Sequence, residues 1–176
     1  MTPTKRREID SLAETILEGL ELQVPFNIET AVARLGGIFE QRQMTKNQPE
    51  AFIKKVGERF CIVLNINHQE ARKRFSVAHE LGHLFLHMGY LTDPDTWQNA
   101  KEYQDSVFYR YGYGVEEAEA NEFAAAFLMP KDEFCRVVEE KTANGQCLIE
   151  AVAAHFNTSK EATLNRGRLL GMFRSE

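Results

Sequence analysis

Residues 72–87 read RKRFSVAHELGHLFLH and contain the motif H-E-x-x-H, whose defining residues are His79, Glu80 and His83. On an α-helix, residues four positions apart lie one above the other, so both imidazoles point the same way and can share one metal ion. Neutral imidazole is a good ligand for Zn²⁺, and the intervening glutamate is placed to act on a water molecule bound to the ion. The stretch therefore predicts a helix with two metal ligands, His79 and His83, and a catalytic carboxylate, Glu80.

The motif is improbable by chance in a chain of this size, on the order of 1 in 100 from background residue frequencies. An apolar, strand-like segment precedes it and an acidic, helical segment follows it, which strengthens the prediction. The alternative is that both histidines are ordinary residues of an amphipathic helix, but Glu80 would then have no role. A metallohydrolase is the leading interpretation.

A tetrahedral catalytic zinc site needs a third protein ligand. Residues 115–130, VEEAEANEFAAAFLMP, read as a second helix and offer Glu116, Glu117 and Glu119. Glu117 borders the apolar stripe expected to pack on the first helix, whereas Glu119 points away from it by more than a quarter turn. Glu117 is therefore the predicted third ligand. A solvated acidic first turn, favoured by the helix dipole, is the other interpretation of all three and the expected one for Glu116 and Glu119.

Two polar neighbours have expected roles outside the ligand set. Asn121 lies four residues after Glu117 on the same face, where its amide can hydrogen-bond a ligating imidazole, as metal-bound histidines usually require. His87 lies four residues beyond His83 and, on an unbroken helix, about 6 Å further along the axis, too far for the same tetrahedral site. We expect a supporting, substrate-side or structural role for His87.

Residues 88–114 match no regular pattern and read as a long irregular segment, of the kind that is either functional or mobile. One tyrosine phenol of this segment could stabilise an oxyanion, while aromatic packing is the expected role for at least two of the three candidates. These are Tyr109, Tyr111 and Tyr113.

The remaining elements follow from periodicity and turn residues. The segments that read as helices are residues 5–20, 28–35 and, as three short helices, 131–173. The segments that read as strands are residues 38–40, 51–56 and 60–66. The last strand could bind an extended substrate by strand addition or could be internal to the sheet, and both options stay open. Asn67, with Glu70 three residues on, is a candidate cap for the metal helix.

Composition is that of an ordinary soluble globular protein and predicts one domain over residues 1–176, a core of residues 1–130 with the helices of 131–176 packed on it. A net charge of −5 makes direct binding of nucleic acid unexpected. Three widely spaced cysteines argue against a disulfide framework and favour the reducing cytoplasm. No apolar run is long enough for a membrane span, and none follows the charged N-terminus as in a secretory signal.

Three stretches resemble the ImmA/IrrE family of zinc metallopeptidases: RFSVAHELGHLFLH, EAEANEFAAAFLMP and LIEAVAAHFNTSKEATLNRGRLLG. The most specific elements are the R-F-x-x-A-H-E-x-G-H core and the E-x-E-A-N-x-F-A-A-x-x-L-M-P block. The resemblance implies an α+β fold with a zincin-like core, made of a small mixed sheet, the H-E-x-x-H helix and a glutamate-bearing helix. It also implies that the first glutamate of the E-x-E-A-N block, Glu117, is a metal ligand.

The same resemblance implies a zinc-dependent endopeptidase that cleaves repressors or antitoxin-like regulators with helix-turn-helix domains. In such an enzyme His79, His83 and Glu117 hold one Zn²⁺, and Glu80 acts as the general base on the attacking water. Mn²⁺ or Fe²⁺ could occupy the same site, since two histidines and a carboxylate also suit those ions.

Two other interpretations stay open. One is a DNA-binding regulator, because residues 148–171 have the length and break of a helix-turn-helix, with Ser159 as N-cap and Lys160, Asn165, Arg166 and Arg168 beyond it. The turn lacks a glycine and the protein is acidic, which both count against this interpretation. The other is a non-catalytic or latent protein that binds a transcription regulator, although the intact catalytic glutamate counts against a dead enzyme.

Overall fold

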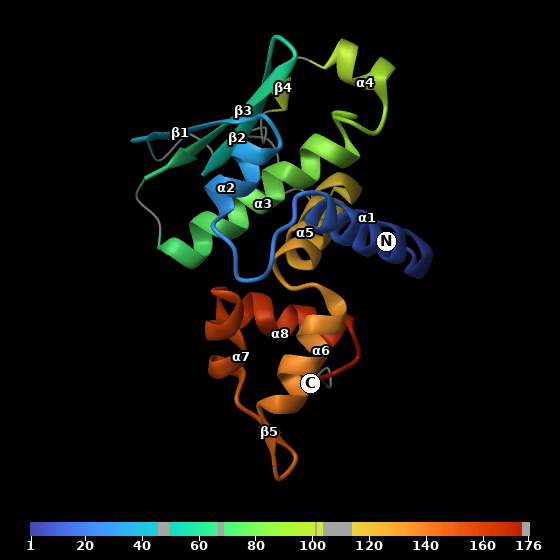
Figure 1. The fold of residues 1–176 in the computed structure, drawn as a ribbon, viewed down its shortest axis with the longest axis vertical. Helices are drawn as coiled ribbons and strands as arrows, with labels where there is room; N and C mark the ends of the chain where they lie inside the picture. The colour runs from blue at the N-terminus through green and yellow to red at the C-terminus, as the bar shows by residue number, and fades with distance from the viewer. Residues whose placement is uncertain (46–49, 67–68, 101, 104–113, 174–176) are drawn as a thin grey trace.

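The computed structural model describes residues 1–45, 50–66, 69–100, 102–103 and 114–173 (Figure 1). Its helices are α1 (Pro3–Gly19), α2 (Ile28–Arg34), α3 (Glu70–Leu86), α4 (Pro94–Asn99), α5 (Val115–Leu128), α6 (Lys131–Glu140), α7 (Ile149–Phe156) and α8 (Lys160–Leu169). Its strands are β1 (Ile38–Arg42), β2 (Ala51–Val56), β3 (Arg59–Asn65) and β4 (Glu102–Tyr103), with a small hairpin of β5 (Thr142–Ala143) and β6 (Gln146–Cys147). The fold is α+β, as predicted.

The four main strands form a mixed sheet in the order β1-β3-β2-β4. Strand β1 runs parallel to β3, and β2 runs antiparallel to both β3 and β4. Residues 60–64 of β3 are buried in succession, as expected for a strand covered on both faces. Because β3 is paired on both edges, its internal role is confirmed and substrate addition along this strand is wrong.

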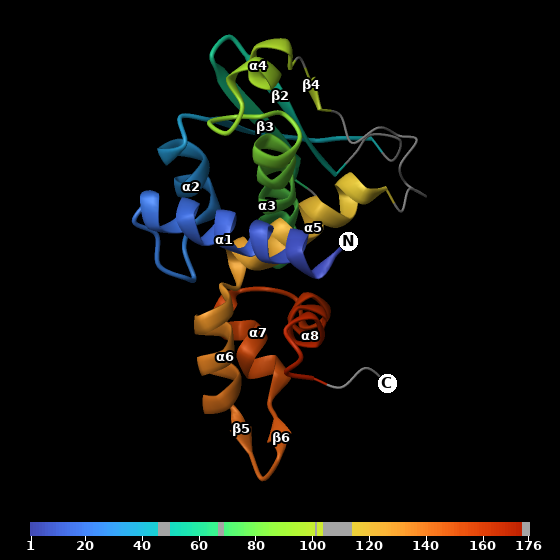
Figure 2. The ribbon, with the colours of Figure 1, turned by 90° about the vertical axis from the view of Figure 1, so that its right-hand side faces the viewer.

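Helix α3 packs on β2 and β3, and α1 and α5 lie between this layer and the C-terminal helices (Figure 2). In its second half α3 is buried on nearly every side, because the sheet covers one face and α5 covers another. The helix starts at Glu70, and Gln69 at the N-cap position makes no side-chain cap hydrogen bond, so the predicted cap by Asn67 is not tested. Asn67 itself lies outside the described residues.

The expected irregular segment, residues 88–114, is in part regular. It contains α4, which Asp93 caps by accepting hydrogen bonds from the backbone N–H groups of Asp95 and Thr96, and the short strand β4. The local signal for α4 is a capping aspartate before Pro94, an arrangement typical of helix N-termini. Tyr109, Tyr111 and Tyr113 lie outside the described residues, so the oxyanion prediction stays a prediction.

Helices α3 and α5 approach each other closely at Gly82. A Cβ atom added there would lie 2.9 Å from the Cα of Ala120 and 3.0 Å from its carbonyl oxygen. Only glycine at position 82 leaves room for the α5 backbone at this distance. The α5 residue that packs against it is Ala120, which also has a small side chain. This contact holds the first turn of α5 above the H-E-x-x-H segment of α3.

A buried cluster of charged side chains joins the first helix, α1, and the last helix, α8, to α5. Arg166 of α8, fully buried, donates from Nη1 to Asp10 of α1 at 2.9 Å and to Glu122 of α5 at 3.2 Å. Its Nε donates to the carbonyl oxygen of Met129 at 3.1 Å, and Arg6 donates to the second oxygen of Glu122 at 3.0 Å. Burial raises the pKa of the Glu122 carboxyl, and the two arginines oppose that rise.

The C-terminal helices share the hydrophobic core of the sheet and its helices. One cluster of buried side chains includes Ile9 of α1, Leu81 of α3, Phe123 of α5 and the stacked rings of Phe134 and Phe156. The division of the chain at residue 130 stays a prediction. Among the helices that the structure describes, none combines the length and the hydropathy of a membrane span.

Replacing Gly82 by alanine is expected to destabilise the protein by about 1–3 kcal/mol, because the added methyl group forces α5 away from α3. The loss outweighs the gain of about 1 kcal/mol in helix propensity. Gly19→Ala is the matched control, since no atom lies within 4 Å of its added Cβ. Urea unfolding of both variants measures the difference, and a stability of Gly82→Ala at or above the wild-type value would contradict this packing.

Arg166→Met is expected to destabilise the protein by about 3–5 kcal/mol, because it leaves the buried carboxylate of Glu122 short of a charge partner. Arg168→Met, two residues along the same helix, changes an exposed arginine that donates to Asn165. Its effect is expected to be about 0.5 kcal/mol or less. Thermal unfolding of the two variants compares them, and equal losses would show that the buried cluster contributes nothing particular.

Candidate metal centre

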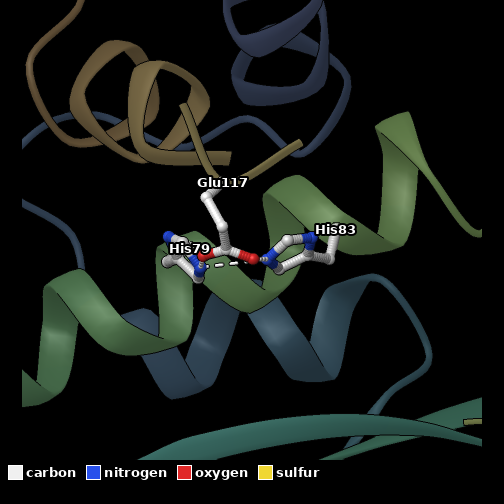
Figure 3. Close-up of side chains that lie close together, drawn as sticks. All are labelled: His79, His83 and Glu117. Atoms are coloured by element: carbon white, nitrogen blue, oxygen red, sulfur yellow. Dashed lines mark hydrogen bonds and ion pairs between the residues drawn. The ribbon is translucent and has the colours of Figure 1, made fainter. Parts of the chain in front are cut away.

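Three side chains converge between α3 and α5: His79 and His83 from α3, and Glu117 from the first turn of α5 (Figure 3). The two Nε2 atoms lie 2.9 Å apart. Glu117 Oε2 lies 3.3 Å from His79 Nε2, and Glu117 Oε1 lies 3.4 Å from His83 Nε2. One ligand atom from each residue lies within 4.8 Å of the other two. The structure thus brings together the three residues that the sequence singled out.

These distances fit a tetrahedral ion. Two ligand atoms each about 2.05 Å from zinc, at the tetrahedral angle, stand about 3.3 Å apart. The distances of 3.3 and 3.4 Å, which go to the two different oxygens of Glu117, lie close to that value, and the 2.9 Å between the two Nε2 atoms is shorter. Two imidazoles and one carboxylate are also the donor set of catalytic sites that keep a fourth position for water. The three residues therefore form a candidate metal site.

The site is closed on one side and accessible on the other. The side chain of His83 is fully buried, whereas those of His79 and Glu117 are 12% and 19% exposed. Burial lowers the pKa of His83 to about 4, because a charged imidazole would lose its hydration there. Hydrogen bonds from His79 and His83 hold the pKa of the Glu117 carboxyl far below its usual range. At neutral pH His83 is neutral and Glu117 is ionised, the states in which both bind metal.

Asn121 lies where the sequence placed it. Its Oδ1 is 3.0 Å from Nδ1 of His79, so the predicted hydrogen bond to a candidate ligand is confirmed. When a metal ion occupies Nε2, the proton of the imidazole is on Nδ1 and is donated to this amide oxygen. Asn121 thereby holds His79 in the tautomer that a ligand needs.

Glu80, the predicted catalytic residue, lies on α3 directly after His79 and is 1% exposed. Glu116 is exposed, as expected of an acidic first turn. Glu119 departs from that expectation. Its side chain is only 13% exposed and contacts Nε2 of His87 at 3.3 Å and Nζ of Lys5 at 4.0 Å. The local spacing did not reveal this contact, because it depends on how α1 and α3 lie against α5.

Comparison with known proteins agrees with this geometry. A fold resembling this one occurs in a Mycobacterium tuberculosis transcriptional regulator, with a TM-score of 0.63 and 16% sequence identity. The alignment covers 91% of this chain and 46% of that one, so this chain spans less than half the length of the regulator. At this identity the likeness concerns the fold. No curated protein matches the chain significantly.

The family model of the M78 peptidases, described as the IrrE N-terminal-like domain, matches residues 38–167. The matched range is most of the chain and contains both helices of the candidate site, α3 and α5. The ImmA/IrrE resemblance of the two motifs is thereby confirmed, and the chain belongs to the M78 peptidase family with an IrrE N-terminal-like domain.

Proposed function

We propose that this chain is a zinc-dependent endopeptidase with a zincin-like core. The observation that carries the proposal is the convergence of His79, His83 and Glu117 within 4.8 Å of one another, from two helices far apart in sequence. Membership of a peptidase family supports the same conclusion. Two nitrogens and a carboxylate favour zinc, although Mn²⁺ or Fe²⁺ also suits this donor set.

The residues around the site have complementary roles in peptide hydrolysis. When bound, zinc supplies a Lewis acid that activates water and polarises the scissile carbonyl. Glu80 accepts a proton from the attacking water and then passes it to the leaving amine. His79, His83 and Glu117 hold the ion, and Asn121 keeps His79 in its binding tautomer. The buried side of the site, at His83, excludes bulk water from the reaction.

The proposed substrate is a repressor or antitoxin-like protein with a helix-turn-helix domain. This part of the proposal rests on the ImmA/IrrE resemblance, and the fold shared with a protein named as a transcriptional regulator is compatible with it. Direct binding to DNA is not favoured. Arg166, one of the basic residues of the helix-turn-helix interpretation, is fully buried, and Lys160 is paired with Glu150.

Loss of a residue that only hydrogen-bonds a ligand typically weakens metal binding by roughly 10- to 100-fold. Removing any one of the ligands themselves is expected to weaken zinc binding by more than that. The variants are His79→Ala, His83→Ala and Glu117→Gln, and the measurement is competition for Zn²⁺ with a chromophoric chelator. Glu116→Gln is the matched control, because it changes the neighbouring, exposed carboxylate. If Glu116→Gln weakens binding and Glu117→Gln does not, the assignment of the third ligand is wrong.

Glu80→Gln is expected to bind zinc as the wild type does and to lose proteolysis, because the amide accepts no proton from water. A candidate helix-turn-helix regulator is co-expressed with wild type or variant, and cleavage is read by intact mass. Cutting by the wild type alone supports the endopeptidase. Binding of a regulator without cutting by either protein supports the latent regulatory protein instead. A salt-dependent shift of non-specific duplex DNA would support the DNA-binding interpretation.

A further inference from the structure

His87 lies outside the candidate ligand set yet contacts it directly. Its Nδ1 is 2.9 Å from Nδ1 of His83, and its Nε2 is 3.3 Å from Oε2 of Glu119. His87 is the C-cap residue of α3, with φ −121° and ψ −29°, so the chain leaves the helix there. The ring of His87 lies beside that of His83, with 5.0 Å between the ring centres.

The contacts link the position of the proton on His83 to the position of the proton on His87. A neutral imidazole has one N–H and one lone pair, so in a contact between two Nδ1 atoms one donates and the other accepts. If His83 directs the lone pair of Nε2 into the site, its proton is on Nδ1 and is donated to His87. The proton of His87 is then on Nε2 and is donated to the carboxylate of Glu119. The opposite arrangement would place the Nε2 lone pair of His87 against a carboxylate.

Glu119, the last residue in this series of hydrogen bonds, is also contacted by α1. Nζ of Lys5, from α1, lies 4.0 Å from Oε1 of Glu119, while the other carboxylate oxygen faces His87. The side chains of His87 and Glu119 are 9% and 13% exposed, and that of His83 is fully buried. Hydrogen bonds so shielded from water are stronger electrostatically than exposed ones. Helices α1, α3 and α5 therefore meet in one line of contacts that ends at His83.

We propose that Glu119 and His87 are positioning residues that hold His83 in the Nδ1–H tautomer, so that its Nε2 lone pair faces the metal site. They do for His83 what Asn121 does for His79, with a carboxylate in place of a backbone or amide acceptor. The inference rests on the proposed metal centre for its effect on zinc. With zinc on Nε2 the proton of His83 is on Nδ1, and His87 and Glu119 supply the acceptor for that proton.

The test uses two variants at position 87 that differ in hydrogen bonding. His87→Phe removes both nitrogens, whereas His87→Gln keeps an oxygen that accepts from His83 and an amide that donates to Glu119. His155→Phe is the matched control, because His155 pairs with Glu133 at 3.1 Å on the C-terminal helices. Competition with a chromophoric chelator gives the zinc affinity. We expect His87→Phe and Glu119→Leu each to weaken binding by about 10- to 100-fold.

The remaining arms distinguish a positioning role from a structural one. His87→Gln is expected to retain most of the affinity, and the double variant His87→Phe with Glu119→Leu to be no weaker than the worse single variant, since both act in one chain. Long-range ¹H–¹⁵N spectra of the zinc-loaded wild type should show the proton of His87 on Nε2, where it is donated to Glu119, and the proton of His83 on Nδ1.

Wild-type zinc binding that His87→Phe leaves unchanged would overturn the inference and leave the metal centre standing. A wild type that binds no zinc would overturn the proposed function, and with it the basis of this inference. A proton on Nδ1 of His87 in the zinc-loaded wild type overturns the positioning role, because that ring then accepts no hydrogen bond from His83. Should His87→Phe fail to fold, Glu119→Leu and the wild-type spectra carry the same decision.

Discussion

The close contact between α3 and α5 at Gly82 is the constraint from which the site follows. Helix α3 alone supplies two imidazoles on one face, and nothing local to it supplies a third ligand. Because Gly82 has no side chain, the backbone of Ala120 approaches within a distance that any Cβ would forbid. That approach places Glu117, three residues earlier on α5, across from both histidines. The candidate centre is therefore a property of a helix pair.

Burial and hydrogen bonding set the protonation states of His83 and Glu117 in the protein without a metal ion. The fully buried His83 resists protonation, while Glu117 is held as a carboxylate by the imidazoles that face it. Asn121 orients one ring from α5, and the contact with His87 orients the other from the end of α3. The surroundings thus favour the uncharged ring and the charged acid, the combination that a divalent cation binds most readily.

The C-terminal helices illustrate how one pattern can support two interpretations. Residues 148–171 have the break expected of a helix-turn-helix, and Ser159 caps α8 by accepting from the backbone N–H of Ala162. Asn157 adopts the left-handed conformation at the end of α7, a role usually taken by glycine. Yet Arg166 turns inward to Asp10 and Glu122, so this side chain serves packing and is closed to a phosphate backbone.

The sequence by itself determined the helix of the H-E-x-x-H motif, the helix face on which Glu117 lies and the partner of His79, because helical periodicity places such residues on known faces. Only the tertiary structure decided that Glu119 contacts His87 and that Arg166 is buried. Only it decided, too, that β3 is paired on both edges. Each of these depends on which element lies beside which, and on the direction of a long side chain across that contact. Spacing within one segment carries information about its own faces, whereas the neighbour that covers a face is chosen by the packing of the whole chain.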